Sequence, residues 1–173
     1  MSSLKRITIE YNEQEDRISL AGLTQSGQTV TMWITMRLMS RLIIHCLGLL
    51  ERGSLEPKKI PTENPKSKES IQNFVQKSAE EQIVKETPVE MSVDSPEHLI
   101  IEIDVTNTGS GLSIIFKGEP DSVHDIFFNG EQLRQWLAML YTVWQKAEWP
   151  KAIWPAWMEK DRSQPTRSEI SVH

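Results

Sequence analysis

The pattern of hydrophobic and polar positions in residues 1–52 changes its period once. Apolar and polar side chains first alternate, as in half-buried β-strands, over three runs separated by polar turns: residues 6–11, 17–23 and 29–34. From Leu38 to Leu50 the apolar side chains recur at helical spacing, which predicts an amphipathic helix. Thr35 stands where an N-cap is expected, and Gly53 stands just past the helix end. Residues 1–52 are therefore predicted to form a βββα unit.

Residues 98–149 repeat this order of patterns. Three alternating runs come first: residues 99–105, 112–116 and 123–128. A helical period follows from Leu133 to Trp144. Asn129 and Gln132 have the spacing of a capping box, which favours a helix start there over a hairpin turn at the Asn-Gly pair. This segment is predicted to be a second βββα unit.

The two units align without a gap at one constant offset. The alignment places apolar positions opposite each other: Ile7 with Ile101, Ile9 with Ile103, Trp33 with Phe127, Met39 with Leu133 and Leu42 with Trp136. Few aligned residues are identical, but the apolar pattern, the turns and the caps stay in register, which indicates a duplication. A three-stranded sheet with one helix is marginal alone, so the units are expected to pack together. We predict an α+β fold: tandem duplicated βββα units forming a pseudo-two-fold domain with antiparallel sheet(s) and two long helices.

The segment between the units, residues 53–97, is predicted to be a flexible linker. It is rich in Pro and Lys at first and acidic later. Within it, Phe74 and other apolar residues have rough helical spacing over residues 70–84, which predicts a short helix. Two interpretations stay open: a transient helix that touches the domain loosely, or a recognition helix that orders on a protein partner. The linker is also long enough for the halves to pair within one chain or to swap between chains, as in a dimer.

Tryptophan and proline alternate after the second helical period, in the stretch AEWPKAIWPAWMEK. The proline after Trp149 ends the helix there, and Pro155 divides the rest of the stretch into two turns. Residues 150–160 are predicted to form a bent amphipathic segment, which we name the tryptophan tail. The polar residues 161–173 are predicted to be disordered.

The apolar side chains in and beside the tail, Trp149, Ile153, Trp154 and Trp157, are the strongest candidates for a binding surface. They can cover the core of the chain itself, form an interface with a protein partner or a second copy, or bind a sugar or a lipid interface. Tryptophan is enriched at interface hot spots because it buries much area with few torsions. The counterpart of the tail after the first helix contains no aromatic residue, so the tail is an addition to the repeated unit.

Arg37, Arg41 and His45 form a stripe along the polar side of the first predicted helix. Arginine near a helix N-terminus is mildly unfavourable to the helix dipole, so the stripe invites a functional explanation. It is either a solvated face or the binding site of an acidic partner, which could be the chain's own residues 80–90. Nucleic acid is disfavoured, because the net charge is −5 and the sequence pI is about 5.4.

Catalytic and metal-binding motifs are absent: the sequence has no nucleophile elbow, P-loop, zinc-protease or EF-hand spacing. His45 and Cys46 are helical neighbours and point about 100° apart, so Cys46 is expected to be a buried structural thiol. Asp121, His124 and Asp125 are close together, but neighbours on a strand face opposite ways and make a poor metal cage. No cofactor and no metal are expected.

These observations leave three functional hypotheses. The leading one is a non-enzymatic protein-protein interaction or assembly module that uses the tryptophan tail. The second is an enzyme or small-ligand-binding domain with a site between the two halves, where His124, Asp125, His45 and Arg41 would act. The third is a nucleic-acid accessory factor that uses the arginine face of the first helix.

Composition limits the class of protein. The 173 residues, 38% of them hydrophobic, suit one soluble domain or two small lobes that share a core. The single cysteine excludes an internal disulfide and fits a reducing compartment. The longest apolar run, residues 42–50, is far shorter than the roughly 20 residues that span a bilayer, and the N-terminus has no targeting pattern. A cytoplasmic location is therefore expected.

Overall fold

The computed structural model describes residues 1–55 and 64–159, which form an α+β fold with one six-stranded sheet and three α-helices. The prediction of disorder over residues 161–173 lies outside these ranges, as do residues 56–63 of the predicted linker. No helix in the described ranges is both long enough and apolar enough to cross a membrane.

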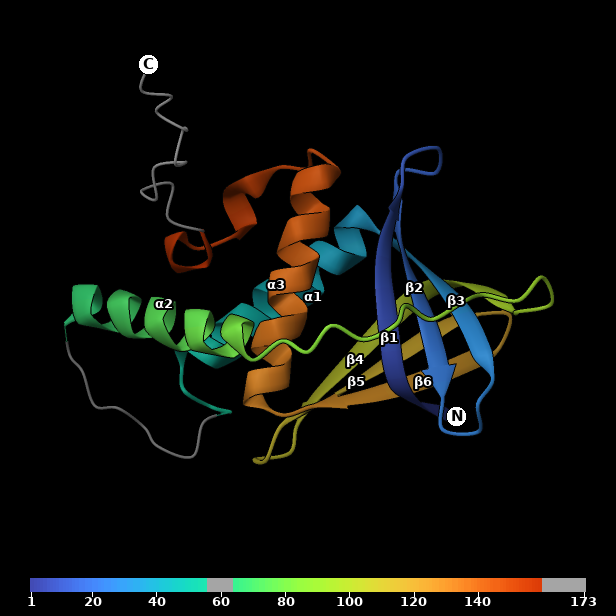
Figure 1. The fold of residues 1–173 in the computed structure, drawn as a ribbon, viewed down its shortest axis with the longest axis horizontal. Coiled ribbons are helices and arrows are strands. Elements are labelled where there is room, and N and C mark those ends of the chain that lie inside the picture. The colour runs from blue at the N-terminus through green and yellow to red at the C-terminus, as the bar shows by residue number, and fades with distance from the viewer. Residues whose placement is uncertain (56–63, 160–173) are drawn as a thin grey trace, which may run out of the picture.

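The elements follow the predicted order, and the helix between the two units begins earlier than the short helix predicted over residues 70–84 (Figure 1). The strands are β1 (Ser2–Asn12), β2 (Arg17–Thr24), β3 (Thr29–Thr35), β4 (Glu97–Asn107), β5 (Leu112–Glu119) and β6 (Ser122–Phe128). The helices are α1 (Met36–Glu51), α2 (Pro65–Glu81) and α3 (Gly130–Lys146), and two single 3-10 turns, η1 (Lys151–Ile153) and η2 (Ala156–Met158), come after α3. Both predicted helix starts are confirmed: Thr35 accepts a hydrogen bond from the Leu38 amide, and Asn129 and Gln132 form a complete capping box.

The sheet closes on itself, which the sequence did not predict. β1-β2-β3 and β4-β5-β6 are antiparallel, as expected, but the two triplets are joined by parallel seams. Thr31–Trp33 pairs with Glu97–Leu99 at one seam, and Ser2–Ser3 pairs with His124–Asp125 at the other. The expectation of antiparallel pairing alone is corrected here. The first and third strands of each triplet run in the same direction, so joining two like-oriented triplets end to end makes both junctions parallel.

Each parallel seam is short, and a helix packs beside it. α1 contacts β3 and β4, and α3 contacts β1 and β6. The apolar faces of the sheet and of both helices meet in one core, where many side chains are fully buried: Ile18, Leu20, Met32, Ile43, Leu50, Ile114, Phe116 and Leu137. Beyond Leu99, β4 has no paired strand on its α1 side within the described residues. A helix therefore lies beside each strand edge that the short seams leave unpaired.

Strand pairing corrects part of the sequence alignment. β1 has an irregularity between Leu4 and Arg6, and β4 has one between Ile100 and Glu102. Leu4 pairs with Thr24, and Ile100 pairs with Gly118. The first strands therefore correspond at an offset of 96 residues (Leu4 to Ile100), whereas the second strands correspond at 94 (Thr24 to Gly118).

The cause of this shift is the first hairpin turn. Asn12 and Arg17 enclose four residues, whereas the corresponding Thr108 and Gly111 enclose two. The alignment without a gap is therefore wrong in the first strand. Ile7 corresponds to Ile103, and Ile9 corresponds to Val105.

Candidate functional site

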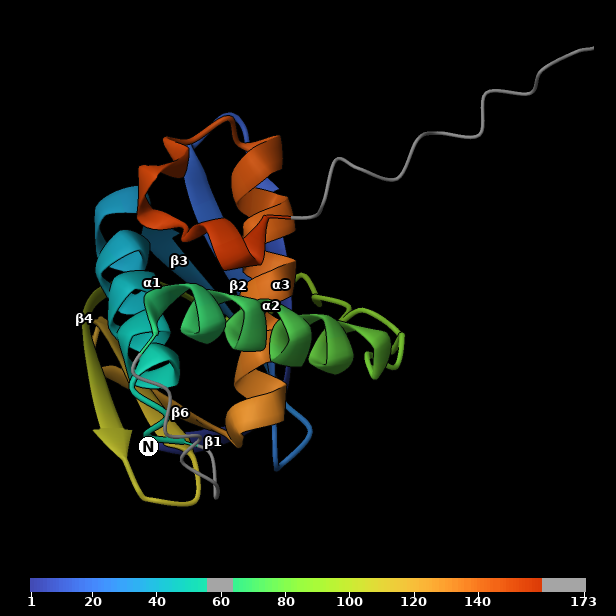
Figure 2. The ribbon, with the colours of Figure 1, turned by 90° about the vertical axis from the view of Figure 1, so that its left-hand side faces the viewer.

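The tryptophans in and beside the tail lie in the chain's own core. Trp149, Trp154 and Trp157 are 6%, 7% and 5% exposed, and Ile153 packs against them half-buried. Figure 2 shows the tail passing from the end of α3 across to α1, and η2 also packs on α2. Of the uses expected for these side chains, the structure shows that they cover the core of the chain itself. As folded, the three tryptophans are at least nine-tenths buried, and Ile153 is half-buried.

The indole N–H groups fix the tail to other elements. Trp149 donates a hydrogen bond to Asp16 in the β1–β2 turn (2.8 Å), and Trp157 donates one to Glu51 at the end of α1 (3.1 Å). Trp144 of α3 donates to the Pro150 carbonyl (3.0 Å). The hydrogen bond from Trp149, followed by one from Tyr11, lowers the pKa of Asp16. The longer first hairpin thus provides the carboxylate that holds the end of the second unit.

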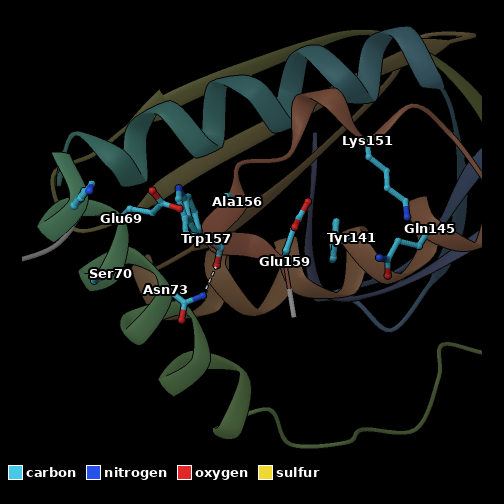
Figure 3. A pocket seen from close by; sticks show the side chains of 10 residues that line it. Glu69, Ser70, Asn73, Tyr141, Gln145, Lys151, Ala156, Trp157 and Glu159 are labelled. Atoms are coloured by element: carbon cyan, nitrogen blue, oxygen red, sulfur yellow. Dashed lines mark hydrogen bonds between the residues drawn. The ribbon is translucent and has the colours of Figure 1, made fainter. Parts of the chain in front are cut away.

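Helix α2 corresponds to the short helix predicted within residues 70–84. Its buried side chains are Gln76 and Ala79, and Gln76 donates a hydrogen bond to the Arg134 carbonyl on α3 (3.0 Å). Figure 3 shows Asn73 reaching from α2 to the backbone of Trp157 (3.1 Å). Phe74 is 74% exposed and does not take part in this packing. It remains a candidate contact for a partner.

A pocket of about 1000 Å³ lies between α2, α3 and the tail (Figure 3). Its charged side chains are two cations and two carboxylates: Lys66, Lys151, Glu69 and Glu159. The lining has no histidine or cysteine, so it lacks a thiol nucleophile and an imidazole base. This balanced polar lining does not favour one class of ligand.

Two of the predicted stripe residues line a groove between α1 and β4, which we name the β4–α1 groove. Arg41, His45, Leu38 and Leu42 form its helix side, and residues 101–105 form its strand side, around a volume of about 420 Å³. Arg37 lies outside this lining. Within the described ranges, Arg37 and Arg41 form no ion pair. The acidic residues 80–90 do not fill this role either, since Glu86 faces Arg6 at 3.9 Å.

The strand side of the β4–α1 groove combines apolar and acidic side chains. Ile101 is 56% exposed. Lys117 Nζ lies 2.5 Å from Glu102 and 2.7 Å from Asp104, and these carboxylates raise the Lys117 pKa. Because β4 has an unpaired edge here, the groove can accept an added strand as well as side chains.

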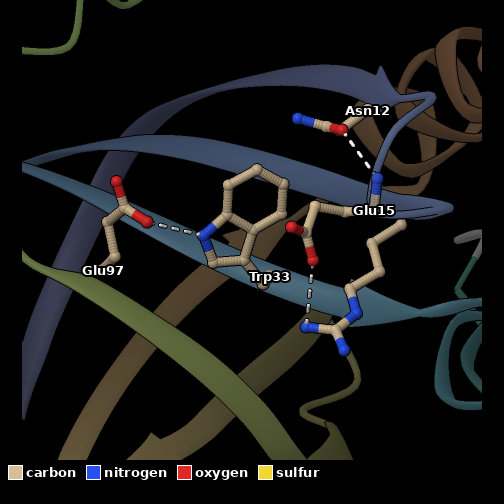
Figure 4. A network of polar contacts seen from close by, with 5 residues as sticks. Asn12, Glu15, Trp33 and Glu97 are labelled. Atoms are coloured by element: carbon tan, nitrogen blue, oxygen red, sulfur yellow. Dashed lines mark hydrogen bonds and ion pairs between the residues drawn. The ribbon is translucent and has the colours of Figure 1, made fainter.

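An apolar strip leads from the groove onto the outer face of the sheet. Leu99, 37% exposed, pairs with Trp33 across the β3–β4 seam. Figure 4 shows the Trp33 indole donating a hydrogen bond to Glu97 (3.0 Å), which fixes the ring on this face. On β2, Arg17 is 3.9 Å from Glu15 in the β1–β2 turn.

A second cavity, the β1–α3 pocket, occupies the corresponding place in the other half of the molecule. All nine residues that line the β4–α1 groove have counterparts in its lining, at an offset of 96 on the strand and 94 on the helix. Ile103 corresponds to Ile7, for example, and Arg41 to Gln135. Residues 83–88 of the chain also line this pocket, whose volume is about 700 Å³.

The segment beside the β1–α3 pocket runs in extended form from α2 towards β4 (Figure 1). The Val89 amide donates a hydrogen bond to the Thr8 hydroxyl (2.8 Å), and the Val89 side chain is buried. Glu86 faces Arg6. The chain's own extended segment thus lines one of these two cavities and does not line its counterpart.

The four residues expected to act together between the halves are not brought together. His124 and Asp125 lie at the β6–β1 seam, where Ser2 and Ser3 contact them at 2.7 Å and 2.8 Å. His45 and Arg41 line the β4–α1 groove, whose lining contains neither of the other two. The hypothesis of one site formed by these four residues is corrected, because their strands and helix face different seams.

The single cysteine lies in the core. Cys46 is fully buried, and burial raises the pKa of its thiol to about 12, as expected for a structural cysteine. Among residues 1–55 and 64–159, no three His, Cys, Asp or Glu side chains gather where they could hold a metal ion.

His124 is expected to make stability depend on pH. Burial, followed by the nearby charge of His98, lowers its pKa, so the folded state binds its proton less readily than the unfolded state does. The stability that neutral His124 provides is present above about pH 6.5 and is lost as the pH falls through the lowered pKa. Urea midpoints at pH 7.5 and pH 5 should differ less in His124→Gln than in the wild type. If the urea midpoint changes equally with pH in the two proteins, His124 is not the source of the pH dependence.

Comparison of the chain with protein-family models, with curated protein sequences and with solved structures found no match.

Proposed function

We propose that the protein is a non-enzymatic interaction module that binds an extended, acidic segment of a protein partner in the β4–α1 groove. The observation that carries this proposal is the pair of corresponding grooves. The β1–α3 pocket is lined in part by the chain's own extended residues 83–88, whereas these residues do not line the β4–α1 groove. Residues 83–88 therefore show how an extended peptide can lie beside a groove of this kind.

The proposal includes an internal duplication with pseudo-two-fold symmetry. Three correspondences support it: the order of three strands and a helix, the N-caps Thr35 and Asn129, and the irregularity near the start of β1 and β4. A duplicated unit provides two copies of the same kind of groove. Each copy lies between the helix of one half and the first strand of the other half. One copy can then be lined in cis by the chain's own segment while the other is used for a partner.

The helix side of the groove, rather than its strand side, favours an acidic partner segment. Arg41 and His45 are exposed along its helix side, and Arg37 extends the stripe towards the start of α1. Glu102 and Asp104 are both bound by Lys117, which offsets part of their charge. Carboxylates of a partner can therefore approach the helix side, while apolar side chains contact Ile101 and the strip beyond it.

The free edge of β4 supports binding in an extended conformation. Backbone groups beyond Leu99 have no strand partner on the α1 side, so a peptide can add main-chain hydrogen bonds there. In this proposal the tryptophan tail stabilises the module and does not contact the partner. This changes the expected binding residues from the tryptophans to Arg41, His45 and the edge of β4.

The proposal predicts peptide binding that depends on both sides of the groove. The full-length protein is screened against two libraries of short extended peptides, one rich in Asp and Glu and one rich in Lys and Arg. Acidic peptides should bind, and Arg41→Glu and Ile101→Asp should each lower the affinity for them by roughly tenfold or more. Arg41→Glu repels the carboxylates of the peptide, and Ile101→Asp adds a charge to the apolar contact. Binding is measured by fluorescence anisotropy at two salt concentrations, and affinity should fall at the higher one.

Arg17→Glu is the matched control, because Arg17 is an arginine outside the groove lining. It should leave peptide affinity unchanged. Amide exchange along residues 101–105 should also slow when an acidic peptide is bound. The proposal is refuted if no acidic peptide binds, or if Arg41→Glu and Ile101→Asp bind such peptides as well as the control does.

A further inference from the structure

The β1–α3 pocket has features of a small-molecule site that are independent of the proposed peptide groove. Its volume of about 700 Å³ is within the range of ligand pockets in proteins. Apolar side chains from four parts of the chain form most of its walls: Ile7, Ile9, Ile83, Phe128, Met139 and Val143. Such walls suit the apolar body of a ligand.

Two residues that line this pocket each have a buried hydrogen-bond donor with no acceptor among the described residues. The Nε1–H of Trp136 and the Nε–H of Arg6 are both buried and unpartnered within the described part of the chain. Trp136 is only 1% exposed and stacks on Phe128 with ring centroids 5.2 Å apart, so its indole lies deep in the lining. Neither group can act as an acceptor, and a buried donor without a partner costs free energy. A ligand with acceptor atoms would satisfy these donors.

The charges that line the pocket are mainly positive. They are Lys5, Arg6, Lys85 and Glu86, which makes three cations and one carboxylate on a chain whose net charge is −5. The Arg6 guanidinium is 3.9 Å from Glu86, so it is not fully engaged by that carboxylate. This local excess favours an anionic ligand over a neutral or cationic one.

We infer that the β1–α3 pocket binds an amphipathic carboxylate, with its apolar chain against the sheet and α3 and its carboxylate accepting from the unpartnered donors. The ligand class follows from the three properties together: apolar walls, donors without acceptors and an excess of positive charge. A carboxylate is an acceptor without a donor, so it complements Arg and Trp N–H groups.

The test uses monomeric decanoate as the probe, below its micelle concentration, with decanol and decyltrimethylammonium as ligands of similar chain length. Full-length protein is titrated by calorimetry, and the indole N–H resonances are followed by NMR. The Trp136 signal is assigned as the one missing in Trp136→Phe, a variant that keeps an aromatic ring against Phe128. Decanoate should bind and shift this signal, and the two other amphiphiles should bind at least tenfold more weakly.

Arg6→Gln and Trp136→Phe should each lower the affinity for decanoate by roughly tenfold, because each removes one of the two unpartnered donors. Arg17→Gln, which changes an arginine outside the pocket, should have no effect. Arg6 is partly exposed, so its variant tests the inference even if Trp136→Phe is less stable. The inference is overturned if decanoate does not bind, if decanol binds equally well, or if the Trp136 signal stays in place at saturation.

Discussion

A chain that ends at Lys146 is expected to be largely unfolded at room temperature. The truncation removes Trp149, Trp154 and Trp157, which are all at least nine-tenths buried. It also uncovers Trp144, which contacts Trp149 and Trp154 edge-on at 4.8 Å and 6.0 Å. The loss of a single buried tryptophan typically costs about 3–5 kcal/mol, and a whole domain is stable by only about 5–15 kcal/mol. The expected loss is therefore as large as the total stability.

The control is a chain that ends at Glu159, which keeps every buried residue of the tail and removes only the residues beyond it. It should melt within a few degrees of the full-length protein. Thermal melting by circular dichroism and mass by light scattering are recorded for all three chains. If the Lys146 form melts like the full-length protein but differs from it in oligomeric state, the tail is an interface, and the assignment of the tail to the core is wrong.

The elements of the fold could be predicted from local pattern. Alternation indicated the strands and helical spacing indicated α1 and α3, because burial on one face imposes a different period on each element. Thr35 and Asn129 marked the helix starts, since capping depends on a few adjacent residues. These signals depend only on residues that are close together in the chain, so they can be recognised in a single sequence.

The closure of the sheet could not be predicted in this way. A strand pattern indicates which face is buried, but it does not identify the neighbouring strand. The seams join residues far apart in sequence, such as Ser2 with His124, over very few pairs. The two-residue shift in β1 was also hidden, because it keeps Ile7 and Ile9 on the same face of the strand. An offset of two residues is invisible to a period of two.

The candidate site was predicted in part. Arg41 and His45 were found because helical spacing puts them on one exposed face. Their opposite wall on β4 was missed, since Ile101 and Asp104 are near α1 only through the closed sheet. The role of the tail depended on whether its tryptophans fold back, which composition does not determine. Its hydrogen bonds to Asp16 and Glu51 come from distant turns and helix ends.

Replacing Arg134 with alanine is expected to destabilise the protein by about 3 kcal/mol, with the largest local effect on α2. Arg134 is 1% exposed, although it is charged. Its Nη2 donates a hydrogen bond to Gln72 of α2 (2.7 Å), and its guanidinium lies 5.7 Å from the centre of the Trp157 ring. One side chain of α3 therefore contacts both α2 and the tail. Alanine removes these contacts and leaves a cavity among them.

Arg134→Met separates packing from polar contact, because methionine keeps an apolar stem of similar length without the donors. Its loss should be about half that of alanine, whereas Arg37→Ala, on an exposed arginine of α1, should stay within about 0.5 kcal/mol of wild type. Urea unfolding gives the stabilities, and amide exchange shows whether α2 opens first. If Arg134→Ala matches Arg37→Ala, then α2 is held by other contacts, such as Gln76 with the Arg134 carbonyl and Asn73 with the tail. If instead α2 exchanges faster while the sheet does not, Arg134 is the residue that couples the segment between the two halves to the core.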